Sequence, residues 1–474
     1  MALRPLPNPA FSPGVAVADA LSTGDRERLR HYAEYLDFYN GKQWPKARSG
    51  RTNLVVNYAR TIVDKSVSYL LGQGINFSVP REPGPEGDAR AAGAEALLYR
   101  LYEENDLDAV DVQAATNGAI LGDTVYKLFW DASQKRIRIV NQDPFAFFPR
   151  WAEDDVATLL SASVVYRLSP EEVARRWGGG ETGRGHARGH VHGGDTRNIL
   201  PVAPSPTLLV PIVETWTPSE LVIVAGDKEL FRGANVYGFI PFVHIPNARP
   251  ANQFWGVSDL KDLIPLNREL NERMSDMADI IRFHADPPVV FKGITEHTSL
   301  AVGPGTVWDV PEGAEVSLLE WRGQQPAVHL HLERVLRALH DVAETPKTAF
   351  GDAGRIQSGV ALETELQSLI QKTLRKRAWW NAGLRRRNAL ALRMAELMGL
   401  GSFVPYRSKV IWAPLLPADL EADVRNNVAL VEAGLRSRRT AMDRLGEESP
   451  EEEMARVEGE REVSSKQSAV SSEQ

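Results

Sequence analysis

The sequence contains no cysteine, which excludes disulfide bonds and thiolate metal sites. It also has no run of about 18 apolar residues, so we expect no helix that spans a membrane. The first residues, MALRPLPNPAFSPG, lack a long apolar core, which predicts that they are no secretory signal. The lack of cysteine fits a reducing compartment without establishing one.

An excess of basic charge is missing as well. The 474 residues carry 55 Lys and Arg against 62 Asp and Glu, a formal net charge of −7. Proteins that hold DNA tightly usually have a basic excess. Either nucleic acid is not the partner, or DNA must not be held firmly. The apolar and charged fractions are those of an ordinary globular protein, and the length allows two to four domains.

The sequence also lacks the short motifs of catalysis. There is no P-loop, no G-x-G-x-x-G after a strand, no G-x-S-x-G, no H-E-x-x-H and no calcium loop. Three histidines, His186, His190 and His192, could in principle bind a metal. No Cys or carboxylate stands at a spacing that completes a rigid site, so a solvated Gly-rich insertion is the favoured interpretation. We predict no catalytic residue, no metal site and no cofactor.

The first half of the chain mixes helical and strand patterns. Helices are predicted over Asp25–Asn40, 53–74 and 91–104, and two strands joined by a polar turn within 124–151. Strand-like runs return at three places after a Gly- and His-rich stretch, 178–198, that is predicted to be disordered. The chain from about 25 to 250 is therefore predicted to be α+β with antiparallel strands. The three later runs are 207–216, 221–231 and 240–247.

The second half is mainly helical. A helix is predicted over Gly256–His284, with Pro265 as its start or a kink. A small β-rich module, a second helix near 327–343, a loop and a long helix over 359–400 follow. At 1.5 Å per residue the long helix would reach roughly 60 Å, which predicts either a kink near Gly383 or use as a strut. A strand and a helix pair broken at Gly434 come next.

Two charged stretches allow two interpretations each. RKRAWWNAGLRRR, residues 375–387, is either a stacking and phosphate-binding surface for nucleic acid or a packed segment whose arginines pair with acidic neighbours. The negative total charge favours packing. EDD, residues 153–155, is either a metal-binding cluster or a solvated loop at a strand end, and the loop is favoured.

The stretch FGDAGRIQSGVALET, Phe350–Thr364, places glycines and small residues between two substantial helices. Taken by itself, it is a plain connector between helices or a functional loop. Its surroundings decide between the two, because several longer segments resemble those of a known family. They are FYNGKQWPKARSGRTNLVVNYARTIVDKSVSYLLGQGINFSVP, AILGDTVYKLFWD, VNQDPFAFFPRW, NQFWGVSDLKDLIPLNRELNERMSDMADIIRFHADP, AFGDAGRIQSGVALET and VEAGLRSRRTAMDRLG.

In their order and spacing, these segments resemble portal proteins of tailed bacteriophages, of the type found in siphophages of Gram-positive hosts, over residues 30–450. The resemblance implies an α+β ring subunit with a wing, a helical stem, a small β-rich clip and a helical crown. The implied parts are a flexible arm (1–24), the wing (25–255, with a disordered insertion at 178–198), a stem helix (256–285), the clip (286–326), a second stem helix (327–345), a tunnel loop (346–358), a long helix (359–400), wing strands (401–417), crown helices (418–463) and a disordered tail (464–474).

The resemblance also implies a function that is not enzymatic. Double-stranded DNA would be packaged and ejected through a ring, expected to be dodecameric, at one vertex of the virion capsid, assembled in the host cytoplasm. The implied protein partners are the terminase large subunit, a head-completion or adaptor protein, and the major capsid and scaffolding proteins, with no membrane. A capsid or tail assembly ring without a DNA role, or a metal-dependent DNA-processing enzyme, are the alternatives.

The tunnel loop is where the resemblance places the channel residues. Lys347 and Arg355 are the expected phosphate contacts, and Ser358 is expected to cap the long helix. An acidic protein with one or two basic residues per loop suits weak, repeated contact with sliding DNA. The residues assigned to the loop are Lys347, Thr348, Phe350, Arg355, Gln357 and Ser358, with Gly351, Gly354 and Gly359 as hinges.

Overall fold

The computed structural model describes residues 21–72, 74–177, 209–285, 289–293, 313, 315–318, 325–351, 359–415, 420–445 and 453–457. These residues form a mixed helix and sheet structure, which confirms the predicted α+β class. The chain divides into two compact units, Met1–Trp412 and Ala413–Gln474.

Four helices fill the N-terminal part of the first unit: α2 (Thr23–Tyr39), α3 (Tyr58–Leu71), α4 (Pro85–Glu104) and α5 (Leu107–Leu121). α2 lies within one or two residues of its prediction. The predicted helix over 53–74 begins only at Tyr58, because Asn57 caps it and the residues before it are extended. No helix was predicted at α5. Apolar residues lie on all sides of α5, so its sequence lacks the one-sided apolar spacing that indicates an amphipathic helix.

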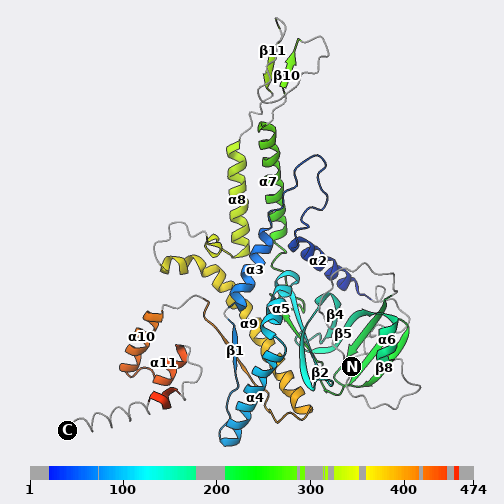
Figure 1. Cartoon of the computed structure of the whole chain (residues 1–474), viewed down its shortest axis with the longest axis vertical. Coiled ribbons are helices and arrows are strands. Elements are labelled where there is room, and N and C mark those ends of the chain that lie inside the picture. The colour runs from blue at the N-terminus through cyan, green and yellow to red at the C-terminus, as the bar shows by residue number, and fades with distance from the viewer. Residues whose placement is uncertain are drawn as a thin grey trace, which may run out of the picture. The chain divides into compact units, whose positions relative to one another are not determined.

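Two antiparallel sheets lie beside these helices (Figure 1). The first has the order β3-β2-β9, and its central strand, β2, is almost wholly buried. The second has the order β4-β5-β6-β7-β8. The predicted hairpin within 124–151 is confirmed as β2 and β3, whereas the end of that stretch forms β4 in the other sheet. The strands are β2 (Asp123–Asp131), β3 (Arg136–Gln142), β4 (Phe147–Trp151), β5 (Leu159–Leu168), β6 (Val210–Trp216), β7 (Glu220–Ala225), β8 (Lys228–Ala234) and β9 (Phe242–Pro246), with the short helices η1 (Pro144–Ala146) and α6 (Pro170–Trp177) between strands.

The long helix α9 (Gly359–Leu397) packs on this first sheet. A Cβ on Gly383 would lie 2.3 Å from Ile245 of β9, so this glycine permits the close approach of helix and strand. Figure 1 shows α9 changing direction nearer its N-terminal end. The kink predicted near Gly383 is therefore wrong in position. After α9, β12 (Lys409–Trp412) pairs with β1 (Ile75–Ser78).

A helical hairpin leaves the body of the first unit (Figure 1). It consists of α7 (Leu263–Ala285) and α8 (Gln325–Ala343), with the paired strands β10 (Val289–Lys292) and β11 (Glu315–Leu318) between them in sequence. Of the two predicted starts, Gly256 is wrong, because residues 256–262 are not helical, whereas a start at Pro265 is confirmed to within two residues by Leu263. The Gly256 N–H donates to buried Asp123 at 2.8 Å. Pro265 lies in the first turn of α7, where its missing N–H costs nothing.

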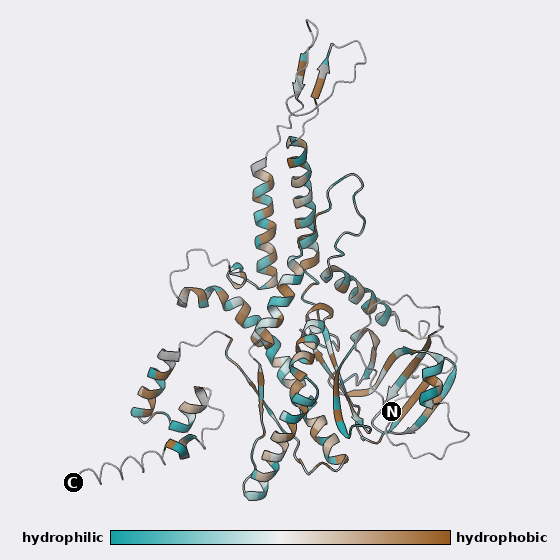
Figure 2. Ribbon diagram, in the orientation of Figure 1, coloured by the Kyte–Doolittle hydropathy of each residue, from teal (hydrophilic) through white to brown (hydrophobic). Residues whose placement is uncertain are grey.

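The seam of this hairpin is apolar. Leu270 packs with Leu332 and Val335, and methionines of α7 lie against the same cluster. Nearer the body, Leu263 packs with Leu339 and Ala343. Higher numbers on one helix therefore meet lower numbers on the other, so the two helices are antiparallel. Figure 2 shows hydrophobic and hydrophilic residues recurring along both, as expected when one face of each is buried.

A polar ladder on α7 binds residues 52–59, an extended segment that leads into the first turn of α3. Four α7 side chains spaced four residues apart accept hydrogen bonds from backbone N–H groups of this segment. Four helical residues rise about 6 Å, close to the advance of two extended residues, so the two spacings match from Thr52 to Val56. The last donor, Ala59, follows three residues later, inside α3. The pairs are Thr52 with Asp279 (3.0 Å), Leu54 with Ser275 (2.9 Å), Val56 with Asn271 (2.8 Å) and Ala59 with Asn267 (2.9 Å).

We expect Asn271→Ala to loosen this segment. The substitution leaves the Val56 N–H without its acceptor and also removes the Asn271 donor to Gln43 Oε1, at 2.6 Å. Unsatisfied buried groups of this kind cost about 1–3 kcal/mol. Thermal unfolding should shift downward, and trypsin should cleave faster within 46–51. His284→Ala, at an exposed position on the same helix, is the control, and equal effects of the two would contradict the ladder's role.

The second unit contains α10 (Leu420–Glu432) and α11 (Arg438–Arg444). Gly434, between them, has a φ of 67°, a value that favours glycine. The helix pair predicted to break at this residue is confirmed.

Candidate functional site

The chain between α8 and α9 begins as a tight turn. Its described part is the 3₁₀ helix η2 (Lys347–Phe350), which ends at Gly351 with a φ of 90°. Lys347 is exposed, whereas Thr348 and Phe350 are half-buried. The turn thus directs one of the predicted residues to solvent and packs the next ones against the protein. Gly351 has the positive φ that a hinge or turn glycine provides.

Contacts with α8 and α3 hold this turn in place. The Phe350 ring lies 5.5 Å from the His340 ring, centroid to centroid, and the Lys65 ammonium lies 5.8 Å from the Phe350 centroid. His340 Nδ1 donates to the Thr345 carbonyl at 2.8 Å, and Thr345 is fully buried. Phe350 therefore anchors the start of the segment.

Cationic side chains of α9 bind the end of α8 from the other side. Lys372 donates to the Ala343 carbonyl at 2.9 Å, and Arg375 contacts the Glu344 carboxylate at 2.5 Å. Carbonyls at a helix C-terminus lack intrahelical partners and carry partial negative charge, so these cations stabilise the end of α8. Lys372 and Arg375 thus join α9, which follows the predicted loop, to the end of α8, which precedes it.

Beneath this junction lies a buried charge cluster. Asp259, whose side chain is only 8% exposed, forms an ion pair with Lys376 and lies 3.8 Å from Lys372. Burial opposes ionisation of Asp259, but the two lysines more than offset it and lower its pKa to about 2. Burial lowers the pKa of Lys376 to about 8, against the opposing effect of Asp259.

Several predicted residues lie outside the described residues: Gly354, Arg355, Gln357 and Ser358, together with His186, His190 and His192. Gly359 is the first residue of α9. The anchoring role of Lys372, Arg375 and Lys376 was not predicted from the sequence. Their spacing of three and four residues on a helix next to the loop was the available signal.

The basic and aromatic stretch 375–387 is mostly packed. Trp380 is buried, Arg387 pairs with buried Asp111, and the Arg377 guanidinium lies 4.8 Å from the Trp412 ring centroid. The packing interpretation is confirmed for these residues. In the EDD stretch, exposed Asp155 accepts hydrogen bonds from the Ala157 N–H and the Thr158 hydroxyl, which confirms the strand-end loop.

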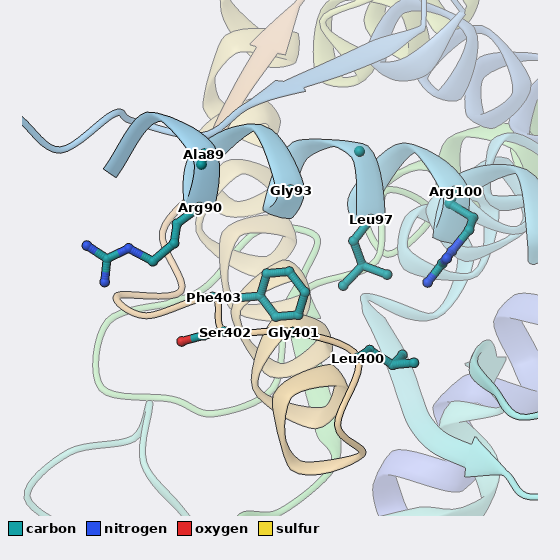
Figure 3. Close-up of a pocket in the computed structure, with 10 residues that line it drawn as sticks. Ala89, Arg90, Gly93, Leu97, Arg100, Leu400, Gly401, Ser402 and Phe403 are labelled. Carbon is teal, nitrogen blue, oxygen red and sulfur yellow. The ribbon is translucent and has the colours of Figure 1, made fainter. Parts of the chain in front are cut away.

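A cavity of about 570 Å³ lies between α4 and the residues that follow α9 (Figure 3). Arg90 and Arg100 flank it, and Figure 3 shows them at opposite ends of the cavity. Arg90 pairs with Glu82 and Arg100 with Glu104, so the two guanidinium groups do not converge on one ligand. The geometry therefore does not define a binding site for an anion.

The described residues contain no group of three or more His, Asp or Glu side chains placed to hold a metal ion. Over the same part of the chain, none of the helices combines the length and the apolar character that a bilayer span requires.

The family of this chain follows from its match to a known protein family. Residues 19–180 and 217–467 match the family model described as "Phage portal protein, SPP1 Gp6-like". The chain belongs to this family of phage portal proteins. No curated protein matches the chain.

The match covers both helices of the hairpin, the turn and α9. It is interrupted at 181–216, a range that holds most of the Gly- and His-rich stretch predicted to be an insertion. Membership of the portal family makes the chain a component of the phage capsid, where portal proteins form homo-oligomeric rings, and a structural protein rather than an enzyme. The expectation drawn from the resemblance is thereby confirmed at the level of the family.

Proposed function

We propose that copies of this portal protein form a dodecameric ring at the unique capsid vertex, and that double-stranded DNA is packaged and ejected through its channel. The ring assembles in the host cytoplasm with the major capsid and scaffolding proteins. It docks the terminase large subunit during packaging and a head-completion or adaptor protein afterwards. ATP hydrolysis belongs to the terminase, and the portal protein needs no cofactor.

In this proposal the parts of the chain have separate tasks. The stem corresponds to 256–285 and 327–345, and the clip between them, 286–326, is the docking surface for the terminase and the adaptor. The other assignments are the arm 1–24, the wing 25–255 and 401–417, the tunnel loop 346–358, the long helix 359–400, the crown 418–463 and the tail 464–474.

The observation that carries the proposal is the double anchorage of the segment between α8 and α9. Phe350 fixes its start against His340, while Lys372 and Arg375 of α9 bind the end of α8. A loop that meets moving DNA needs such a rigid base, because force on the loop is otherwise lost in local unfolding. This anchorage also favours the tunnel loop over a plain connector.

Charge supports weak contact with DNA. The whole chain has a net charge of −7, and exposed Lys347 makes no salt bridge within the described part of the chain. Affinity for DNA depends on the number of phosphates that cations neutralise. A ring that presents one or two cations per copy therefore lets DNA slide rather than holding it.

Electron microscopy of the purified protein tests the assembly. We expect rings with a central hole wide enough for duplex DNA. A monomer or compact dimer at high protein concentration and across salt conditions would refute the portal ring and reopen the alternative of a DNA-processing enzyme.

We expect the double variant Lys347→Ala, Arg355→Ala to package DNA about tenfold less efficiently while forming normal rings. Both cations are assigned to the channel, and neither is needed for the apolar seam of the stem. DNA protected from nuclease in a packaging reaction is the measurement. Lys42→Ala, which removes an exposed cation outside the loop, is the control. Unchanged packaging by the double variant would favour a capsid or tail assembly ring without a DNA role.

A further inference from the structure

The two helices of the stem hairpin carry opposite free charges on the edges that face away from their shared seam. On α8, Leu330, Arg334 and Arg337 recur four and three residues apart, so they lie on one face. All three are exposed, whereas Leu332 and Val335 face the seam. We call these three residues the α8 edge. On α7, Glu272 is exposed, about 160° around the helix from the seam residue Leu270 and about 60° from the ladder residue Ser275.

These charges have only weak partners inside the subunit. Neither Glu272 nor Arg334 makes a salt bridge within the described residues, and Glu272 contributes only as the last of three carboxylates that raise the pKa of Arg273. The Arg337 guanidinium lies 3.8 Å from the Asp341 carboxylate, and both side chains are more than 70% exposed, so this pair contributes little stability. By contrast, the α7 carboxylates on either side of Glu272 are already paired: Glu269 with Arg273 and His331, and Asp276 with Arg48 and Arg273.

The packing of the hairpin places the free charges at one level. Leu270 meets Leu332 and Val335 across the seam, and Leu263 meets Leu339. In an antiparallel pair with these contacts, Glu272 lies within about one helical turn of the level of Arg334. Rotation about an axis parallel to the two helices does not change the height of a residue along that axis. A neighbouring copy related by such a rotation therefore presents its Arg334 within about one helical turn of the height of Glu272.

We propose that the α8 edge of one copy docks against Glu272 on α7 of the next copy in the ring. The inference rests on the proposed ring and names its stem contact. The contact is head-to-tail, since it joins two different surfaces of the same chain, and contacts of this kind close into rings. The neighbour also covers the exposed side chain of Leu330. Nucleic acid bound at the α8 edge would account for the arginines alone, whereas a second copy accounts for the arginines and the carboxylate together.

Charge reversal with mixing tests the contact. Arg334→Glu gives a copy with acidic charge on both surfaces, and Glu272→Lys gives a copy with basic charge on both. We expect each variant alone to need about tenfold more protein for half-maximal ring formation, because like charges then face each other at every contact. An equimolar mixture should form rings at wild-type concentrations, with alternating copies and an even subunit number, as native mass spectrometry of the two marked chains would show.

Glu333→Lys is the matched control, because Glu333 is exposed on α8 but turned about 100° away from Arg334. If the wild-type chain forms no rings, the proposed function fails. If wild-type rings form and both reversed variants assemble equally well, the inferred contact is overturned while the ring stands. Normal Arg334→Glu rings that retain less duplex DNA would overturn it too, and would assign the α8 edge to nucleic acid.

Discussion

Replacing Arg387 by Leu is expected to lower the free energy of unfolding by about 3–5 kcal/mol, the usual cost of removing one partner of a buried ion pair. Arg387 is fully buried on α9 and donates to Asp111 Oδ1 on α5. Burial opposes its charge, but Asp111 and the neighbouring tyrosines more than offset that effect and hold its pKa above the ordinary value. Its guanidinium also lies 4.8 Å from the Tyr126 ring centroid.

The variant leaves the Asp111 carboxylate in the core with only neutral donors, the hydroxyl groups of Tyr102 and Tyr126, each at 2.6 Å. Chemical denaturation is the measurement. The double variant Asp111→Leu, Arg387→Leu should recover part of the loss, because it removes both charges. Arg385→Leu changes an exposed arginine on the same helix and serves as the control. A loss below about 1 kcal/mol in the single variant would show that water reaches this pair.

Asp259→Ala is expected to cost about as much, roughly 3–5 kcal/mol, because it leaves the buried ammonium of Lys376 without its counter-charge. Lys372 keeps the Ala343 carbonyl as an acceptor and suffers less. The damage should concentrate where α9 meets the end of α8, so hydrogen exchange there should rise before global unfolding. Asp262→Ala, at an exposed position three residues away, should be nearly neutral.

The same cluster predicts a dependence on pH. The folded pKa of Asp259, about 2, lies below an unfolded value of about 4. Its stabilisation is therefore complete above about pH 4 and is lost as the pH falls towards 2. The folded pKa of Lys376, about 8, lies below an unfolded value of about 10.4. The unfolded chain holds that proton more tightly, so this group adds stability as the pH rises from about 8 to 10.4.

Without Asp259, the pKa of Lys376 in the folded protein should fall further. The pH range over which stability rises with pH should then extend below pH 8. Melting temperatures measured from pH 6 to 9 should consequently rise more steeply in Asp259→Ala than in the wild type. Parallel curves for the two proteins would show that Lys376 does not depend on Asp259. The double variant Asp259→Leu, Lys376→Met should remove the extra slope.

Local elements whose buried face is periodic could be predicted from the amino-acid pattern alone, because amphipathic spacing indicates which side of a helix or strand meets the core. Most of α7, the helix α8 and the hairpin of β2 and β3 were predictable in this way. The break at Gly434 was predictable from the glycine itself. The order of the quoted segments was sufficient for the family. For α7, Leu260 continues the helical spacing and so predicted a start at Gly256, whereas Pro265 marked the start to within two residues. Hydrogen bonds to Asp123 and Ala119 hold residues 256–262 outside the helix.

Contacts between residues that are distant in sequence became known only from the folded structure. Nothing local in Ile75–Ser78 specifies pairing with Lys409–Trp412, and Gly383 can be assigned to close packing only once Ile245 is seen beside it. Lys376 and Arg387 look alike on a basic helix, yet each is neutralised by a carboxylate more than 100 residues away in sequence. Periodicity reports burial, which is a local property. The partner of a buried charge depends on which elements meet in space, and that is fixed only when the whole chain has folded.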